Sequence, residues 1–258
     1  MNSTLLRSEN LKVQIADCRV CDALNLDIAA GQLTAILGRN GAGKSTLLAS
    51  LAGLRAVQGG GVYYDGVPLA EMPQRQLARR RGWLPQRSED AFSSTVLETA
   101  LIGRHPHLGR WDWEGEADIN MALEALRAVG LDNLATRQIH SLSGGERQRL
   151  AIATLLTQAP SLYLLDEPLA HLDLKYQIAT LKLFAQLAQT RQASVLLVLH
   201  EPSFALRYCH KVILLYGAGD YEYGESSVLL STERLERLYG HPMQKTGSGA
   251  ASWFVPSI

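Results

Sequence analysis

The sequence predicts an α/β fold built around a mainly parallel sheet, and two kinds of segment support this prediction. Short apolar runs at residues 33–37, 162–165 and 194–199 have the composition of strands that are buried on both faces. Stretches with helical spacing at residues 46–54 and 174–189 alternate with these runs. Strands that alternate with helices are typical of parallel sheets, because parallel strands need long crossover connections.

The first forty residues alternate between polar and apolar side chains, which predicts strands with one buried face. The apolar positions are Leu11, Val13 and Ile15 in one run and Leu24, Leu26 and Ile28 in the next. A run of three glycines at residues 59–61 then leads into a further strand at 62–64.

Residues 91–155 differ in composition and spacing from the segments on either side, and they predict a helical insertion into the α/β fold. Met121, Leu123, Leu126 and Val129 follow helical spacing, and a polar connection rich in His, Trp and Gly occupies residues 103–116. The small residues at 247–252 predict a mobile tail.

The charge balance and the apolar runs exclude several classes of protein. The chain has 25 Lys and Arg against 25 Asp and Glu, which disfavours a protein that binds nucleic acid through bulk charge. No apolar run approaches the 18 or more residues of a membrane-spanning helix, and the first residues lack the pattern of a signal peptide. We therefore expect a protein of the cytosol that binds no nucleic acid.

Three cysteines fit a reducing compartment. Cys18 and Cys21 have a Cys-x-x-Cys spacing, but no further Cys or His ligands follow at the spacing of a zinc site. A redox pair normally lies at the start of a helix, whereas this stretch is predicted to be a strand. We expect structural roles for Cys18, Cys21 and Cys209.

A phosphate-binding loop pattern directly follows the predicted strand at 33–37. Its residues are Gly38, Arg39, Asn40, Gly41, Ala42, Gly43, Lys44, Ser45 and Thr46. Glycines let successive backbone N–H groups converge on phosphate oxygens, and the start of the following helix adds a positive dipole. Lys44 can reach the β- and γ-phosphates, while the Ser45 hydroxyl can bind Mg²⁺.

Two adjacent carboxylates, Asp166 and Glu167, end the predicted strand at 162–165. Alone, such a pair is typical of a solvated strand end. With a phosphate-binding loop in the same chain, Asp166 is expected to bind Mg²⁺, and Glu167 is expected to orient and deprotonate the attacking water. Together the two motifs predict a nucleotide hydrolase.

The segment at 142–149 contains a second helix start suited to phosphate. Ser143, Gly144 and Gly145 precede a helical run that begins with Glu146. A chain with one phosphate-binding loop has no obvious use for a second such site on the same nucleotide, but a second copy of the chain does. This predicts a symmetric dimer that holds two nucleotides between facing surfaces. The alternative is a capped helix with no ligand.

On these residues the sequence resembles the ATP-binding-cassette family from about residue 4 to residue 245, because 142–149 matches the family signature. The resemblance implies an α/β P-loop NTPase (RecA-like) core, an N-terminal antiparallel β subdomain and an inserted α-helical subdomain. The expected core is 4–90 and 156–245, the helical signature subdomain is 91–155, and the C-terminal tail is 246–258. ATP and Mg²⁺ are the implied ligands.

Further site residues are implied by the same resemblance. Gln86, in Trp83-Leu84-Pro85-Gln86, resembles the Q-loop residue that contacts Mg²⁺ and the attacking water. His200 resembles the switch histidine that contacts the γ-phosphate. Asp173 resembles the D-loop aspartate that bridges the dimer. Expected catalytic residues are thus Glu167, His200 and Gln86, with Ser45, Gln86 and Asp166 around the metal.

The chain departs from the family pattern at two places. Ile15 stands where the family usually has an aromatic residue that stacks on adenine, so base stacking is weaker or Cys18 and Arg19 supply the contact. The D-loop usually reads Ser-Ala-Leu-Asp, whereas this chain has Ala170-His171-Leu172-Asp173. Hydrolysis should persist, since Glu167 and the other expected catalytic residues are present.

Residues 92–98 and 101–107 resemble the importer ATPases that serve iron–siderophore, haem and cobalamin permeases. The resemblance implies a homodimer of ATPase subunits at the cytoplasmic face of the bacterial inner membrane. It also implies two transmembrane permease subunits and, indirectly, a periplasmic substrate-binding protein. The ATPase would energise uptake of a metal chelate. The alternative is a soluble cassette ATPase without a transport role, such as an assembly scaffold.

Overall fold

The computed structural model describes residues 4–86, 93–190, 193–247 and 252–257. The chain divides into two compact units, and each is described by itself. The first unit comprises Met1–Met72 and Ala185–Ile258, and the second comprises Pro73–Phe184. The strands at residues 81–84 and 162–165 fall in the second unit, together with the helical residues between them.

An antiparallel sheet forms the N-terminal part of the first unit. Its strands are β1 (Thr4–Ile15), β2 (Cys18–Ala29), β4 (Gly59–Tyr64) and β5 (Val67–Pro68), in the order β2-β1-β4-β5. The alternating apolar residues predicted here face the interior: Leu11, Leu24 and Ile28 are completely buried. The strand predictions and the antiparallel β subdomain are confirmed.

Parallel strands form the centre of the first unit. β3 (Leu33–Gly38) lies between β8 (Ser194–Val198) and β9 (Lys211–Gly217) and runs parallel to both, while β10 (Asp220–Glu225) pairs antiparallel with β9. Every residue of β3 and β8 is buried, as predicted for strands covered on both faces. Four helices of this unit are α1 (Lys44–Leu51), α7 (Pro202–Tyr208), α8 (Ser226–Leu229) and α9 (Thr232–Tyr239).

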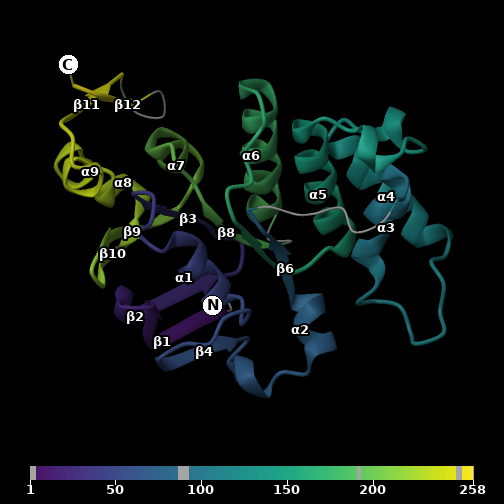
Figure 1. Cartoon of the computed structure of the whole chain (residues 1–258), viewed down its shortest axis with the longest axis horizontal. Coiled ribbons are helices and arrows are strands. Elements are labelled where there is room, and N and C mark those ends of the chain that lie inside the picture. Colours follow the sequence, from purple (N-terminus) through teal and green to yellow (C-terminus); the bar gives the residue numbers. More distant parts are fainter. Residues whose placement is uncertain (1–3, 87–92, 191–192, 248–251, 258) are drawn as a thin grey trace. The chain divides into compact units, whose positions relative to one another are not determined.

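Two short strands form the described part of the C-terminal segment. β11 (Met243–Thr246) and β12 (Trp253–Pro256) form an antiparallel hairpin beside α9 (Figure 1), and residues 248–251 of the expected mobile tail lie outside the described residues. Phe254 is only 3% exposed and its backbone N–H donates to the Ser203 hydroxyl at 2.9 Å. These contacts hold the Phe254 part of β12 against α7.

The second unit combines two strands with most of the helices. β6 (Arg81–Leu84) pairs parallel with β7 (Leu162–Leu165). The helices are α2 (Gln74–Arg80), α3 (Val96–Leu101), α4 (Glu116–Ala128), α5 (Gly144–Gln158) and α6 (Leu174–Gln189), the last of which continues into the first unit. α3, α4 and α5 pack against one another (Figure 1), so the predicted helical insert is confirmed.

Helix α4 begins earlier than its apolar spacing predicts. The periodic residues start at Met121, but the helix starts at Glu116, because the Asp118 carboxylate accepts a hydrogen bond from the N–H of Gly115 at 3.0 Å. Asp118 also accepts from Nε of Arg104 at 2.7 Å. A polar capping contact, which hydrophobic periodicity does not report, adds the first turn.

Within the described part of the chain, no helix is both long enough and apolar enough to cross a membrane. All three cysteines are free: Cys18 is exposed, whereas Cys21 and Cys209 are buried. Burial raises the pKa of the Cys21 thiol to about 11 and raises the pKa of Cys209 further, so both thiols stay protonated at neutral pH.

We therefore predict selective alkylation of the native protein. Iodoacetamide at pH 8 should modify Cys18 within minutes and leave Cys21 and Cys209 intact, because the thiolate is the nucleophile and the buried thiols hold their protons. Peptide mass spectrometry checks this. A control in denaturant should show all three cysteines alkylated, and rapid native labelling of Cys21 would contradict the prediction.

Candidate functional site

The turn between β3 and α1 has the backbone geometry of a phosphate-binding loop. Gly41 and Gly43 adopt left-handed φ angles of 81° and 92°. A Cβ on Gly43 would lie 2.5 Å from a methyl of Val20, so only glycine fits this position. A Cβ on Gly41 would meet nothing within 4 Å, which leaves open space on that side of the loop.

Lys44 is the first residue of α1 and closes this loop. Its Nζ donates to the carbonyl oxygens of Gly38 and Arg39 at 2.9 and 3.1 Å, and the residue is only 6% exposed. The ammonium group thus lies under the loop at the positive end of the helix. This arrangement concentrates positive potential where the phosphate oxygens of a nucleotide would bind.

The pairing of β3 with β8 places His200 beside this loop. Ile36 is in register with Val198, and the N–H of Leu199 donates to the Ile36 carbonyl at 3.1 Å. Two residues further along each parallel strand are Gly38 and His200, so both lie at the same edge of the sheet. His200 is exposed there.

In the second unit the pairing of β6 with β7 brings Gln86, Asp166 and Glu167 together. Leu84 is in register with Leu165, and the N–H of Asp166 donates to the Leu84 carbonyl at 2.9 Å. Gln86 and the two carboxylates therefore follow neighbouring strand ends. Asp166 is 3% exposed, whereas Gln86 is exposed.

Glu167 has an unusual backbone conformation, with a left-handed φ of 51°. This region is costly for a residue with a Cβ and is tolerated where the surrounding structure fixes the chain. The N–H of Ala170 donates to the Glu167 carbonyl at 3.1 Å, which holds the turn after β7. At Glu167 the backbone thus leaves the extended conformation of β7, so the direction of its side chain is set by the turn and not by the strand.

Ser143 caps helix α5 through a reciprocal pair of hydrogen bonds. Its hydroxyl accepts from the N–H of Glu146 at 3.3 Å, and the Glu146 carboxylate accepts from the N–H of Ser143 at 2.8 Å. The Glu146 carboxylate accepts from both the N–H and the hydroxyl of Ser143, and these two bonds lower its pKa. The capped-helix alternative is thus realised in the single chain. It leaves room for an anion, because Ser143 and Gly144 are both exposed.

His171, the unusual residue of the D-loop, lies against this helix start. It has a left-handed φ of 61°, and a Cβ on Gly145 would lie 3.0 Å from its carbonyl oxygen. Gln148 of α5 donates to the Pro168 carbonyl at 3.1 Å. Sequence reasoning identified the two glycines of the signature but missed that the second one provides clearance for the D-loop backbone.

Asp173 is the cap of helix α6. Its carboxylate accepts from the N–H of Tyr176 at 3.1 Å. Tyr176 in turn lies under the guanidinium of Arg149, 4.0 Å from Cζ to the ring centroid, and Arg149 donates to the carbonyls of Val129 and Gly130. Arg149 was not predicted as a site residue. A buried arginine in the signature helix could have been noticed, because it is the last residue of the segment 142–149.

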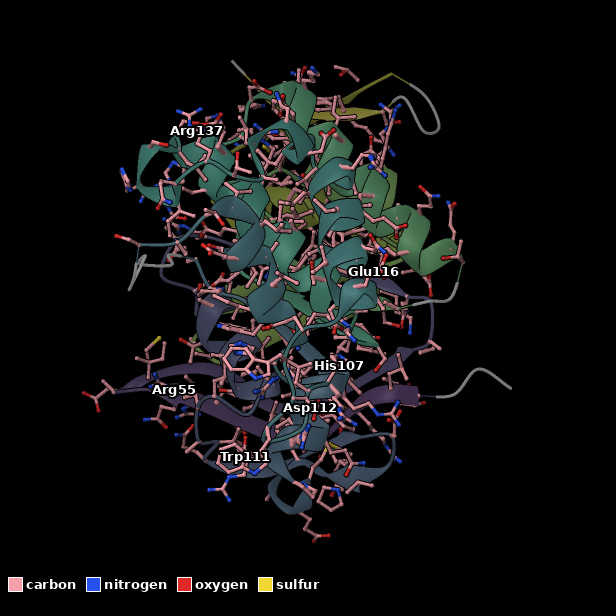
Figure 2. All side chains as sticks on the ribbon, turned by 90° about the vertical axis from the view of Figure 1, so that its right-hand side faces the viewer. Arg55, His107, Trp111, Asp112, Glu116 and Arg137 are labelled. Carbon is pink, nitrogen blue, oxygen red and sulfur yellow. The ribbon has the colours of Figure 1, made fainter. Side chains whose placement is uncertain are left out.

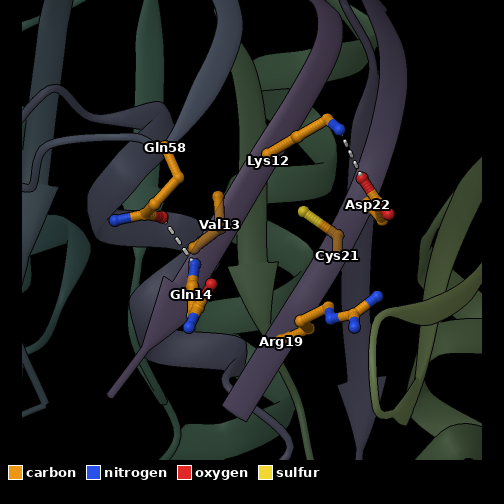
Figure 3. A pocket seen from close by; sticks show the side chains of 7 residues that line it. All are labelled: Lys12, Val13, Gln14, Arg19, Cys21, Asp22 and Gln58. Atoms are coloured by element: carbon orange, nitrogen blue, oxygen red, sulfur yellow. Dashed lines mark hydrogen bonds and ion pairs between the residues drawn. The ribbon is translucent and has the colours of Figure 1, made fainter. Parts of the chain in front are cut away.

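The region around Ile15 contains a small pocket in the antiparallel sheet (Figure 3). Its volume is about 220 Å³ and its lining residues are Lys12, Val13, Gln14, Arg19, Cys21, Asp22 and Gln58. An ion pair of 3.2 Å joins Lys12 to Asp22, and the N–H of Gln14 donates to Gln58 at 2.7 Å. Of the two predicted substitutes for an aromatic residue, only Arg19 lines this pocket.

Hydrogen bonds to α2 and α5 hold the connection that follows α3. Nε of Arg79 donates to the Pro106 carbonyl at 2.8 Å, and the His107 ring makes a 2.8 Å hydrogen bond to the Gln158 carbonyl. Trp111 is 85% exposed (Figure 2), and Trp113 is 89% exposed. Phe92, the first residue of the importer-like segment, lies outside the described residues.

These features define a nucleotide-binding cassette: a phosphate-binding loop, strand-end carboxylates and a second, capped helix start. A family model described as ABC transporter matches residues 21–170. The chain therefore belongs to the ABC transporter family, and the expected α/β cassette fold with its helical insert is confirmed.

Among its relatives, the hemin import ATP-binding protein HmuV of Myxococcus xanthus is 40% identical over 233 residues, covering 88% of this chain and 86% of that protein. The ferric enterobactin transport ATP-binding protein FepC of Escherichia coli is 36% identical over 238 residues, covering 91% and 87%. The chain is thus an ATP-binding, ATP-hydrolysing subunit in the group that contains haem and siderophore importers.

Solved structures agree with this assignment. A structure described as an inward-facing metal-chelate type ABC transporter matches with a TM-score of 0.85 at 31% identity, covering 99% of this chain and 98% of that chain. The cassette MJ0796, solved as a dimer after hydrolysis with ADP and Pi, matches with a TM-score of 0.74 at 26% identity, covering 86% and 99%. Related cassettes are therefore seen as dimers and as parts of transporter complexes.

The loop geometry predicts different costs for two glycine substitutions. Gly43→Ala should lower the free energy of unfolding by about 2–4 kcal/mol, because a left-handed φ and a clash with Val20 act together. Gly41→Ala should cost about 1–2 kcal/mol, since only the backbone strain applies. Urea denaturation without nucleotide measures both values.

A third variant separates the clash from the strain. In a Val20→Ala background the Gly43→Ala substitution should approach the cost of Gly41→Ala, because the two methyl groups nearest the new Cβ are gone. Equal costs for the two glycines in the unmodified background would contradict the prediction.

Proposed function

We propose that two copies of this chain bind and hydrolyse two Mg·ATP between them and thereby drive uptake of a metal chelate through a membrane permease. The observation that carries this proposal is the second helix start at Ser143, in a chain that already has a phosphate-binding loop. Both starts suit an anion, and a head-to-tail dimer is the arrangement that uses both on one nucleotide.

In this proposal the loop from Gly38 to Thr46 holds the phosphates. Backbone N–H groups of Asn40, Gly41 and Gly43 would donate to phosphate oxygens, and Lys44 would supply positive charge beside them. The open space beside Gly41 is consistent with close approach of a phosphate to the backbone. Arg39 is exposed at the entrance of the loop.

The donor set of Ser45, Gln86 and Asp166 fits Mg²⁺. A hydroxyl, an amide oxygen and a carboxylate are all hard oxygen donors, which is the chemistry that Mg²⁺ prefers. The ion would neutralise charge that develops on the β- and γ-phosphates. Asp166 is buried at the end of β7, so its carboxylate is held in one position before the ion arrives.

Glu167 is the proposed general base. It lies one residue beyond the metal-binding carboxylate, on a backbone held in a strained turn, and Gln86 follows the neighbouring strand end. Glu167 would accept the proton of the attacking water, Gln86 would orient that water, and His200 would donate to the γ-phosphate oxygens.

The second copy would complete each site. The N–H groups at Gly144, Gly145 and Glu146, with the Ser143 hydroxyl, would face the γ-phosphate bound by the other copy. The Ser143 hydroxyl now donates to Glu146 at 2.8 Å, so it would turn from the carboxylate to the phosphate on closure. Asp173 would bridge the dimer while its cap on α6 fixes its position.

The remaining partners follow from the relatives. The functions of these relatives, hemin import and ferric enterobactin transport, support a metal-chelate substrate for this system, with cobalamin as a further member of the class. Two permease subunits would bind the ATPase dimer at the cytoplasmic face of the inner membrane. A periplasmic binding protein would deliver the chelate, and the exposed aromatic loop around Trp111 is suited to protein contact.

Replacing the proposed base gives the most direct test. Glu167→Gln should lower the ATP turnover number by about 10²–10⁴-fold, because the amide cannot accept the proton, while ATP-dependent dimerisation persists. The matched control Glu124→Gln changes an exposed carboxylate on α4 and should keep normal turnover. Near-normal hydrolysis by Glu167→Gln would overturn the assignment.

Mixing two inactive variants tests the shared site. Lys44→Ala and Ser143→Ala should each hydrolyse ATP very slowly, but a heterodimer of the two contains one site with both elements intact. An equal mixture should therefore recover about a quarter of the wild-type activity, if exchange is complete and sites are independent. A mixture as inactive as its components would argue that each chain works alone.

A further inference from the structure

The C-terminal elements of the first unit contact the loop that carries His200. The hydroxyl of Tyr239, the last residue of α9, donates to the backbone carbonyl of His200 at 3.3 Å. His200 directly follows β8, and α7 begins two residues later at Pro202. The histidine therefore lies on a short connection whose backbone is bonded to a residue 39 positions further along the chain.

The same connection is held from its other end by the C-terminal hairpin. Glu201 caps α7 by accepting from the N–H of Ser203 at 3.1 Å, and the Ser203 hydroxyl accepts from the N–H of Phe254 in β12 at 2.9 Å. Ser203 is completely buried and Phe254 nearly so. The rings of Phe204 and Trp253 meet edge to face, with centroids 5.5 Å apart. The first turn of α7 is thus fixed by β12.

Helix α9 and the hairpin form one continuous support. The N–H of Met243 in β11 donates to the Glu236 carboxylate of α9 at 3.0 Å. Gly240, which ends α9 with a left-handed φ of 69°, lies beside the phosphate-binding loop, since a Cβ there would be 3.6 Å from Nη1 of Arg39. The C-terminal elements therefore reach both of the first unit's proposed ATP-contacting segments.

The Tyr239 hydroxyl keeps its proton. Burial and then the nearby Glu201 carboxylate raise its pKa above the ordinary value, so it acts as a donor throughout the physiological range. A hydrogen bond from the half-buried Tyr239 side chain to a backbone carbonyl restricts the backbone torsions at that residue. Those torsions set the direction in which the His200 side chain leaves the sheet edge.

We propose that Tyr239 is a positioning residue for ATP hydrolysis, which holds the His200 backbone in place while the hairpin β11–β12 fixes the other end of the same connection. The inference rests on the proposed role of His200 at the γ-phosphate. Tyr239 would act on the chemical step more than on nucleotide affinity, because its hydroxyl bonds the backbone of His200.

The first experiment removes the hydroxyl alone. Tyr239→Phe should lower kcat for ATP hydrolysis about threefold to tenfold with little change in KM, the loss expected for one hydrogen bond that orients a reacting group. The matched control is Tyr221→Phe, which removes a hydroxyl that donates to the Ala23 carbonyl at 2.9 Å in the same unit. Its kcat and KM should stay at wild-type values.

A double-mutant cycle tests whether Tyr239 acts through His200. In a His200→Ala background, measured as single turnovers at high enzyme concentration, Tyr239→Phe should cause no further loss. Ser203→Ala, which removes the acceptor for Phe254, should lower kcat selectively as well. Thermal denaturation of each variant distinguishes a loss of turnover from a loss of folded protein.

The outcomes separate this inference from the proposed function. Wild-type kcat in Tyr239→Phe, with Glu167→Gln and His200→Ala both inactive, would overturn the positioning role and leave the proposed function standing. Additive losses in the cycle would likewise overturn it, because Tyr239 would then act independently of His200. Wild-type turnover in His200→Ala would overturn both the role of His200 and this inference.

Discussion

Parallel strand register is the constraint on which the arrangement of the site depends. In the first unit, pairing of Ile36 with Val198 leaves Gly38 and His200 at the same strand edge. In the second unit, pairing of Leu84 with Leu165 leaves Gln86 beside Asp166 and Glu167. In β6 only Gly82 and Leu84 are buried, so a shift of one residue would bring Arg81 and Trp83 to the buried face. Hydrophobic burial therefore helps to select the register of the β6–β7 pair.

Several site residues also stabilise the fold of the single chain. Ser143 and Glu146 cap α5, Asp173 caps α6, and Lys44 bonds two carbonyls of its own loop. Each polar group is thereby satisfied without a ligand, at a position where an anion or a second chain would also find it. Only one of these bonds needs to change when a dimer closes. The Ser143 hydroxyl can turn away from the Glu146 carboxylate while that carboxylate still accepts from the Ser143 N–H.

The parts of the fold that depend on local pattern could be predicted, and the parts that depend on distant contacts could not. The buried strand β3 and helix α6 follow directly from apolar runs and helical spacing. The hairpin that contains Phe254 could not be predicted, because it is held by contacts to Ser203 and Phe204, about fifty residues away. The site motifs could be recognised because the residues of each motif are contiguous in the sequence. The close approach of Gly145 to His171 could not, because these residues belong to two different motifs that only the fold brings together.

The neutral net charge of the chain fits the way its anion site is built. The loop relies on backbone N–H groups, whose direction is fixed by glycine torsions, and on one ammonium group that is 6% exposed. Nζ of Lys44 donates to two backbone carbonyls of its own loop, so its position is fixed before a nucleotide arrives. A fixed charge held in a site of low exposure attracts a phosphate more strongly than several solvated cations on the surface would. The chain therefore needs no basic excess to bind a highly charged nucleotide, and a balanced surface remains available for contacts with its partners.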